Sequence, residues 1–428
     1  MKIHKGYSIW KKSLNIIDGG TMLFSKNPDR FLPKFWPTYY SKAKECFIWD
    51  LDKKKYVDFS IMSVGTNILG YANKQVNDFV IQQIKKSNIS TLNSYLEVIL
   101  AKKLLKIDQW ADKVRFAKTG GEILAIAVRI SRAHSNKDNI AFCGYHGWHD
   151  WYLSSNLQNK KNLDKNLMSN LSSKGIPNNL TNTSFPFEWN NIDDFEKVVT
   201  KNKVGTVIME VERNIKPKQS FLRQVRSICS RKKIVLIFDE CTSGFRETYG
   251  GIYKKYGVTP DIVMYGKSIG NGFPISVILG KKKIMDASKK TFISSTFWTE
   301  NSGIAAAIKT LELMEKKKSW KVIKQKGIYI KKEILKLSKK HNLKLSISGL
   351  DALPRIEFNK DVNEDYSNFI CYEMLKNRYL FKNTVYLSTA HSDKVIKKFL
   401  KLLDKIFFKI KNGKMVKFKT LTDFKRYN

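Results

Sequence analysis

Short apolar runs alternate with helical patterns between about residues 75 and 315. Several runs are almost uninterrupted, as expected for strands that are buried on both faces. Ile123, Ile126, Ala127 and Ile130 have the spacing of one helix face and predict a helix over Glu122–Ala133. The strands that we expect are Val114–Ala117, Ile140–Cys143, Val204–Met209, Ile234–Phe238, Ile262–Tyr265 and Ile275–Leu279. Together they predict an α/β domain with a mostly parallel sheet.

The chain before this region has a different pattern. A glycine pair at Gly19-Gly20 and several prolines interrupt the first forty-odd residues, which we therefore expect to be irregular. Two alternating runs, 47–52 and 55–59, flank a polar turn and predict a β-hairpin. The stretch 156–183 is rich in Asn, Lys and Ser and predicts a long surface loop.

The chain after about residue 316 predicts a smaller α+β domain. A basic amphipathic helix is expected over about 320–340, and a last helix with one apolar face over 393–410. Short strands are expected near 343–348 and 354–358, and the basic tail beyond Asn412 is expected to be loosely ordered.

The length of 428 residues favours more than one domain. We expect a large domain over 61–315 and a small C-terminal domain over 316–428, which includes the basic tail. The N-terminal segment, 1–60, is expected to pack with the small domain.

Two of the expected strands are followed by ionisable residues that could bind a ligand or take part in catalysis. Asp239-Glu240 follow one strand, and Lys267 follows the next in a glycine-rich turn. Ligands of open α/β sheets bind at the carboxyl ends of strands. An aspartate that keeps a pyridine nitrogen protonated, and a lysine that forms a Schiff base, are what pyridoxal 5′-phosphate requires. Taken alone, the Asp-Glu pair also suits a magnesium site or a helix cap.

A third segment predicts a phosphate site. Thr119, Gly120 and Gly121 lie between an expected strand and an expected helix, where free N–H groups and the threonine hydroxyl can bind an anion. The run Gly266-Lys267-Ser268 is not a nucleotide-binding P-loop, because that motif needs a glycine where Asp261 stands.

These stretches resemble the class III aminotransferases, which are pyridoxal-phosphate enzymes of fold type I. The most specific match is 238–246, Phe-Asp-Glu-Cys-Thr-Ser-Gly-Phe-Arg, followed by Pro260-Asp261 and by 266–270, Gly-Lys-Ser-Ile-Gly. The resemblance extends over nearly the whole chain, and its nearest branch is the glutamate-1-semialdehyde aminomutases. It implies that Asp239 and Lys267 are the catalytic residues, at the ring nitrogen and at the aldehyde of the cofactor.

The resemblance also assigns roles to other residues. Tyr145, in Tyr-His-Gly, would stack on the cofactor ring, and Glu210 and Cys241 would lie near it. Thr296 would reach the phosphate of a second subunit, which implies a homodimer with shared active sites. Three of them also have a structural reading: Tyr145 as a core tyrosine, Glu210 as a strand-end cap and Thr296 as a turn threonine. His146 and His149 have no neighbouring carboxylate motif of a metal site, and we expect no metal.

Departures from the aminomutase pattern concern the substrate. Leu23 and Lys26 stand where that branch has a serine and an arginine for the substrate carboxylate, and Val64 replaces a tryptophan. Gly121 replaces a threonine of the phosphate loop. The expected activity is therefore amino transfer from a donor amino acid to a small carbonyl acceptor, with a 2,1-aminomutase as the alternative.

Composition changes this picture little. The formal net charge is +40, but the basic residues are spread out and form no nucleic-acid-binding signature. A basic nucleic-acid-binding protein on the same fold is the less favoured alternative, and we expect no nucleic-acid partner. The five cysteines are scattered, the N-terminus lacks an apolar signal core, and no apolar run is long enough for a membrane span. We expect a cytoplasmic protein without a membrane partner.

Overall fold

The structure, a computed structural model, describes residues 4–164, 166 and 170–418. The chain divides into two units. Among the described residues, one unit spans Gln75–Lys318, and the other combines residues 4–74 with residues 319–418.

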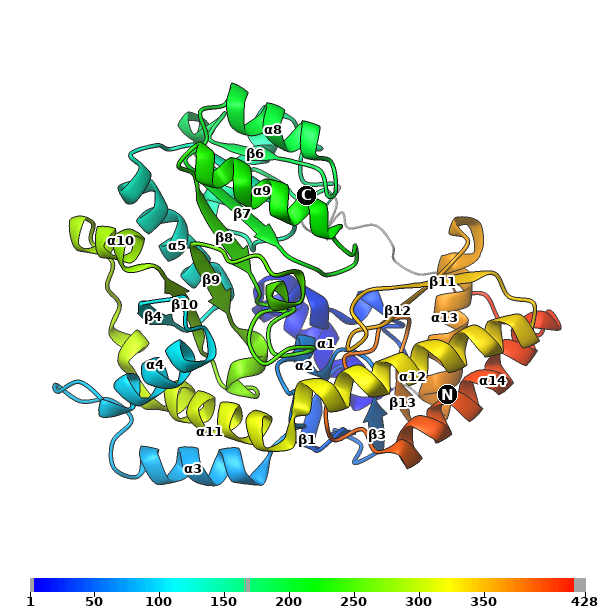
Figure 1. Ribbon diagram of the computed structural model, residues 1–428. Coiled ribbons are helices and arrows are strands. Elements are labelled where there is room, and N and C mark those ends of the chain that lie inside the picture. Colours follow the sequence, from blue (N-terminus) through cyan, green and yellow to red (C-terminus); the bar gives the residue numbers. More distant parts are fainter. Residues whose placement is uncertain (1–3, 165, 167–169, 419–428) are drawn as a thin grey trace. The chain divides into compact units, whose positions relative to one another are not determined.

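A seven-stranded sheet organises the unit Gln75–Lys318 (Figure 1). Its order is β4 (Lys113–Ala117), β10 (Ser276–Gly280), β9 (Ile262–Tyr265), β8 (Val235–Asp239), β7 (Thr206–Glu210), β5 (Ile140–Cys143) and β6 (Ser184–Pro186). Strand β10 is antiparallel to both of its neighbours, and the other pairs are parallel. The predicted α/β fold with a mostly parallel sheet is confirmed.

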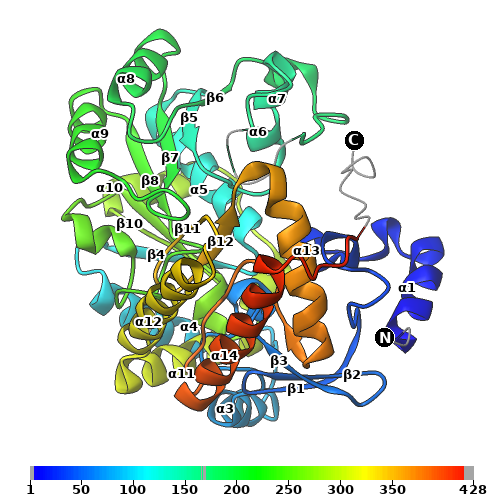
Figure 2. The same cartoon turned by 90° about the vertical axis from the view of Figure 1, so that its right-hand side faces the viewer.

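Helices cover both faces of this sheet (Figures 1 and 2). Helix α5 contacts β4, β7, β8, β9 and β10, while α9 contacts β8 and α8. The helices of this unit are α3 (Lys74–Ile84), α4 (Tyr95–Ile107), α5 (Gly120–Ser135), α6 (Asp150–Leu153), α7 (Ser155–Gln158), α8 (Ile192–Lys201), α9 (Gln219–Arg231), α10 (Lys282–Met285) and α11 (Asn301–Lys317). Its 3-10 turns are η4 (Asn178–Leu180), η5 (Ile252–Tyr256), η6 (Lys267–Gly270), η7 (Asp286–Lys290) and η8 (Thr296–Thr299).

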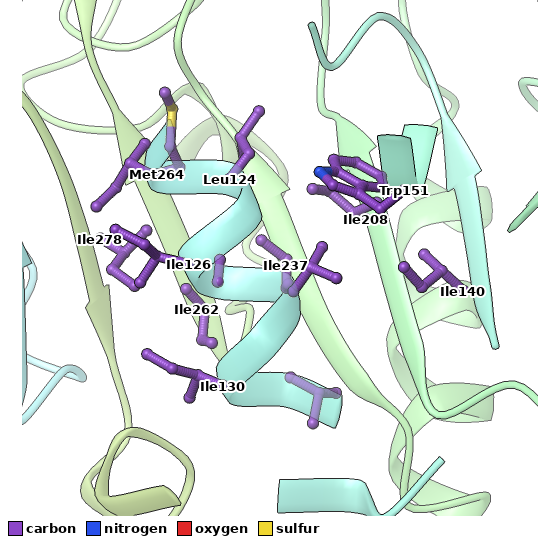
Figure 3. Packing of buried hydrophobic residues seen from close by; sticks show 14 of the residues in the cluster. Leu124, Ile126, Ile130, Ile140, Trp151, Ile208, Ile237, Ile262, Met264 and Ile278 are labelled. Carbon is purple, nitrogen blue, oxygen red and sulfur yellow. The ribbon is translucent and has the colours of Figure 1, made fainter. Parts of the chain in front are cut away.

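The predicted apolar face of α5 builds the core of this unit (Figure 3). Ile123, Ile126, Ala127 and Ile130 are all buried, and they pack against apolar residues of β5, β7, β8, β9 and β10. Such close packing fixes the start of α5 relative to the strand ends, where the candidate residues lie.

The other unit contains a four-stranded sheet, a two-stranded sheet and long helices. The sheets are β1 (Tyr40–Lys44), β2 (Phe47–Asp50), β3 (Lys55–Asp58) and β13 (Tyr379–Leu380), and β11 (Leu345–Ser348) with β12 (Arg355–Phe358). The helices are α1 (Lys5–Ile16), α2 (Met62–Gly65), α12 (Ser319–Lys340), α13 (Lys360–Lys376) and α14 (Asp393–Lys411), with 3-10 turns η1 (Asp18–Gly20), η2 (Phe24–Lys26) and η3 (Pro28–Arg30). Helix α14 packs on α12 and α13.

The expectation that the first forty-odd residues are irregular is wrong, because α1 lies among them. Tertiary contacts hold this helix. His4 at its start lies 3.2 Å from the Asp50 carboxylate, the Lys5 amide donates to Asp52, and Trp10 is buried. A Cβ atom at Gly20 would lie 2.7 Å from the Trp10 ring, so the glycine that interrupts the pattern is what admits the tryptophan.

The loop expected over 156–183 contains the last residues of α7, the turn η4 and otherwise irregular chain, and its residues 165 and 167–169 lie outside the described part. Of the predicted tail, only 413–418 are described, without helix or strand. Within the described ranges, no helix has both the length and the apolar character that crossing a membrane requires.

Candidate active site

The sheet register brings the predicted strand-end residues to one edge. Glu210 pairs with Asp239 between β7 and β8, and Asp239 pairs with Met264 between β8 and β9. Lys267 follows β9 by two residues, and Tyr145 follows β5 by two. Because these strands are parallel, their carboxyl ends form a single site.

Lys267 begins the 3-10 turn η6 in a left-handed conformation, with φ of 41°. This region is uncommon for residues other than glycine, and such strain clusters at functional sites. Its side chain is partly buried, and the Nζ atom donates to the hydroxyl of Thr242 at 2.8 Å. The amine is therefore held at the strand ends by a neutral hydroxyl.

Asp239 ends β8, and only 3% of it is exposed. Its Oδ1 atom accepts the backbone N–H of Cys241 at 3.0 Å, and its Oδ2 atom lies 2.8 Å from Nδ1 of His146. The other ring nitrogen of His146 lies 3.2 Å from the carbonyl of Cys143. Both nitrogens thus face acceptors, which orients the ring and holds the carboxylate in place. The carboxylate retains lone pairs for a further donor.

Tyr145 and Glu210 lie next to each other. The backbone N–H of Tyr145 donates to Oε2 of Glu210 at 3.0 Å, and Arg213 donates to the other carboxylate oxygen at 2.9 Å. Burial raises the pKa of the Tyr145 hydroxyl, so this ring is a neutral phenol. Glu210 is buried and fully engaged within the chain, so its observed contacts are those of a residue that fixes the turn after β5.

Thr119 is the N-cap of α5. Its hydroxyl accepts the N–H of Glu122, and the Glu122 carboxylate accepts the N–H groups of Lys118 and Thr119. This capping box leaves the N–H groups of Gly120 and Gly121, at the first two helical positions, available to an external acceptor. The predicted anion site is therefore made by backbone amides, while the threonine hydroxyl serves the cap.

Cys241 lies between these parts. Its Sγ atom would be 3.3 Å from a Cβ on Gly120 and 3.2 Å from a Cβ on Gly266, so both glycines allow the backbone to pass close to this thiol. Burial raises the pKa of Cys241 to about 11, which makes it a neutral, soft contact surface rather than a nucleophile.

Thr296 is the predicted residue that the structure does not bring to the others. It is exposed at the start of η8, and none of its hydrogen bonds with described residues joins it to the strand-end cluster. Neighbouring Phe297 is 68% exposed.

Three residues that the sequence analysis did not single out for the site belong to it. His146 was considered only as a metal ligand, although it contacts Asp239 from 93 positions away. Thr242 and Arg213 were not assigned roles, yet they contact Lys267 and Glu210. Thr242 lies inside the motif 238–246, so its signal was present, whereas nothing in the sequence around Arg213 indicates its partner.

The donor set fits an aromatic, phosphorylated cofactor with an aldehyde. Two free amides at a helix start suit a phosphate, the Asp239 carboxylate suits a protonated ring nitrogen, and Lys267 supplies the primary amine. Asp239 and Lys267 come from the ends of the adjacent strands β8 and β9, and the two glycines follow β4, from which β9 is separated by β10.

Comparisons with known proteins agree with this arrangement. The family model "Aminotransferase class-III" matches residues 33–402. The 3-aminobutyryl-CoA aminotransferase of Cloacimonas acidaminovorans is 30% identical over 91% of this chain and 92% of its own. The glutamate-1-semialdehyde 2,1-aminomutase of Sulfurisphaera tokodaii is 29% identical over 94% of this chain and 99% of its own.

Solved structures show the same fold. The FumI protein of Sphingopyxis sp. MTA144, in a PLP form, has a TM-score of 0.86 at 23% identity, and covers 96% of this chain and 98% of its own. An omega-transaminase from Sphaerobacter thermophilus has a TM-score of 0.85 at 19% identity, with the same coverage.

Proposed function

The chain belongs to the class-III aminotransferase family, whose enzymes use pyridoxal 5′-phosphate, and from this premise we propose that Lys267 is the residue that carries the cofactor. The observation that supports this assignment most is the position of Lys267, in a strained turn at the strand end beside that of Asp239. The hydrogen bond from its amine to the Thr242 hydroxyl keeps the side chain pointed into the site.

Asp239 is proposed as the partner of the ring nitrogen. When bound, the cofactor supplies an electron sink for the bond that is broken at the substrate's amino carbon. Asp239 keeps the ring nitrogen protonated, and His146 holds the Asp239 carboxylate in place. The amine of Lys267, once released, carries the proton between the substrate Cα and the C4′ atom of the cofactor.

The remaining residues are proposed to hold the cofactor. The amides of Gly120 and Gly121, with Thr119 as the cap, receive the phosphate. The Tyr145 ring stacks on the pyridine ring, Cys241 contacts it, and Glu210 fixes the turn that carries Tyr145.

Borohydride reduction followed by peptide mapping tests the assignment of Lys267. Reduction makes the bond between cofactor and lysine permanent, and we expect the label on Lys267 alone. Lys267→Ala should lose both the label and turnover, whereas Lys282→Ala, at an exposed position, should keep both. A label on any other lysine would overturn the assignment.

We propose amino transfer between a donor amino acid and a small carbonyl acceptor, with an intramolecular 2,1-aminomutase as the second candidate. Relatives with both kinds of name support keeping the two. Amino transfer is favoured by the residues Leu23, Lys26 and Val64, which replace the substrate contacts of the aminomutases. A lysine cannot bind a substrate carboxylate through two parallel hydrogen bonds as an arginine does. We expect 5-aminolevulinate formation from glutamate 1-semialdehyde to be slower by orders of magnitude than turnover of the true substrates; turnover on the order of 1 per second would favour the mutase.

We further propose that the protein is a cytoplasmic homodimer with shared active sites. Support for the dimer comes from apolar residues that are exposed within one segment of the chain, Ile89, Leu92, Tyr95, Val98 and Ile99. The exposed position of Thr296 also suits a contact with a second subunit. Support for the cytoplasm comes from five cysteines that are all free.

A further inference from the structure

The ring of His149 occupies the space into which a side chain at position 121 would project. A Cβ atom on Gly121 would lie 2.5 Å from Cε1 and 2.7 Å from Nδ1 of His149, closer than real Cβ contacts allow. Gly147, with φ of 104°, lets the turn after β5 pass along α5, so that a Cβ there would be 3.6 Å from the Gly121 Cα. The imidazole therefore stands at the start of α5 in place of a side chain at 121.

Neither ring nitrogen of His149 has a hydrogen-bond partner among the described residues. Burial lowers the pKa of His149, ahead of the opposing effect of Glu122, so the ring is neutral near neutral pH. The Nδ1 atom is buried, and a buried N–H without an acceptor is costly, so we assign the proton to Nε2. The ring thus offers one N–H donor, and its contact with the Trp148 ring, at 4.5 Å between centroids, restrains it.

The start of α5 has donors for an anion but lacks a side-chain donor of its own. The hydroxyl of Thr119 and the carboxylate of Glu122 are engaged in the capping box. Gly120 and Gly121 contribute only backbone N–H groups. A phosphate group has three terminal oxygens, each with several lone pairs, which two amides do not satisfy.

We propose that His149 is a phosphate ligand, whose Nε2–H supplies the side-chain donor that Gly121 lacks. This inference rests on the proposed function, in which the start of α5 receives the cofactor's phosphate. An N–H donor to an anionic oxygen forms a strong, charge-assisted hydrogen bond. The close approach of the His149 ring to Gly121 also makes the two residues depend on each other, because any residue larger than glycine at 121 would displace the ring.

The affinities of the apoprotein for pyridoxal 5′-phosphate and for pyridoxal, which has no phosphate, test the proposal. His149→Phe keeps an aromatic ring and removes the donor. We expect it to weaken pyridoxal 5′-phosphate binding by about tenfold to a hundredfold while pyridoxal binding changes less than about twofold. The ³¹P resonance of the bound cofactor should also move. His134→Phe, the same substitution in the last turn of α5, should change neither affinity nor resonance.

A role in packing alone predicts a different result. If His149→Phe and His149→Ala weaken the binding of both ligands equally, or of neither, the proposal is overturned. Unchanged pyridoxal binding shows that a variant is folded. If the wild-type protein binds pyridoxal 5′-phosphate at Lys267 but the ratio of the two affinities is insensitive to His149, this inference fails while the proposed function stands. Failure of the wild type to bind the cofactor would instead overturn the proposed function.

A pair of double variants separates the hydroxyl from the volume it brings. His149→Ala/Gly121→Thr places a hydroxyl donor at 121, and His149→Ala/Gly121→Ala places only a methyl group there. We expect the threonine variant to recover much of the preference for pyridoxal 5′-phosphate over pyridoxal, and the alanine variant to recover none. Equal recovery in both would show that space filling, and not phosphate binding, explains the pairing of residues 121 and 149.

Discussion

Single residues at this site act through partners from distant parts of the chain. The Asp239 carboxylate is held in place because His146 and the Cys241 amide engage both of its oxygens. Its carboxylate is almost completely buried, so its charge is not screened by water. The charge of this one side chain is therefore expected to matter more than its shape.

Asp239→Asn should retain the cofactor and lose most of its turnover. The amide has the size of the carboxylate but no charge to keep the ring nitrogen protonated. We expect kcat to fall by about 10² to 10³, the scale for losing one electrostatic group at a reacting centre. The bound cofactor is followed by its absorbance and kcat by steady-state assay. Asp138→Asn, at an exposed position, serves as the control, and a near-normal kcat for Asp239→Asn would contradict its role.

Glu240, the residue after Asp239, predicts a pH dependence of stability. Burial raises its pKa from 4.5 to about 7, despite hydrogen bonds from Ser243 and from the Tyr253 amide. The folded protein therefore binds a proton that the unfolded chain releases near pH 4.5. The contribution of Glu240 to stability is fully present below that pH and is lost as pH rises through about 7, by ~3 kcal/mol.

Urea unfolding of the wild type and of Glu240→Gln at pH 5 and at pH 7.5 measures this contribution. The glutamine resembles the protonated acid, so the variant should lack this part of the pH dependence. Glu196→Gln, at an exposed position, should follow the wild type. Parallel pH profiles for the wild type and Glu240→Gln would contradict the prediction.

Among the elements, the position of a helix can depend on a close contact between two backbone segments, which helix propensity does not predict. Helix α12 passes the turn after β11 at Gly327, where a Cβ atom would lie 1.6 Å from the carbonyl oxygen of Asp351. In an isolated helix, alanine is more favourable than glycine by about 1 kcal/mol. Backbone on the other side of the contact cannot yield as a flexible side chain does.

Gly327→Ala should therefore destabilise the protein although it improves helix propensity. We expect a loss of about 1–3 kcal/mol or more in the free energy of unfolding, the scale of overpacking in a filled interior. Gln325→Ala, exposed on the same helix, should change it by less than about 0.5 kcal/mol. Thermal and urea unfolding measure both variants. A stabilised Gly327→Ala variant would show that the helix and the turn separate easily.

At the scale of the whole molecule, the chain forms two units, and it passes from one to the other after Lys74 and again at Ser319. We propose these positions as domain boundaries, in place of residues 60 and 315. All the candidate cofactor residues belong to the unit Gln75–Lys318. Leu23, Lys26 and Val64, which we associate with substrate choice, belong to the other unit, so that cofactor binding and substrate choice are assigned to separate units.

Light scattering tests the proposed homodimer. We expect about twice the chain mass of 49.6 kDa at micromolar concentration. Leu92→Asp/Val98→Asp places charges in the exposed apolar segment 89–99 and should shift the protein to monomer, with loss of most activity because the sites are shared. Ile328→Asp, on an exposed part of α12, should leave the mass unchanged. A monomeric wild type would contradict the homodimer, and a dimeric double variant would exclude this segment from the interface.

Local sequence determined the α/β fold and the candidate cofactor residues of this protein. Buried parallel strands give continuous apolar runs, and the residues that end them, such as Asp239 and Lys267, follow directly in the chain. Helix α5 was equally predictable, because its apolar spacing and its Thr119 cap lie within one short segment. For these features, the information that specifies the structure is local.

Only the tertiary structure decided the contacts between distant segments. It placed His146 behind Asp239 and the His149 ring in the space beside Gly121, and it supplied the partners that make α1 a helix. The physical reason is the same in each case. A hydrogen bond or a shared volume between residues far apart leaves no periodicity in the sequence, because it arises only when packing brings the two segments together.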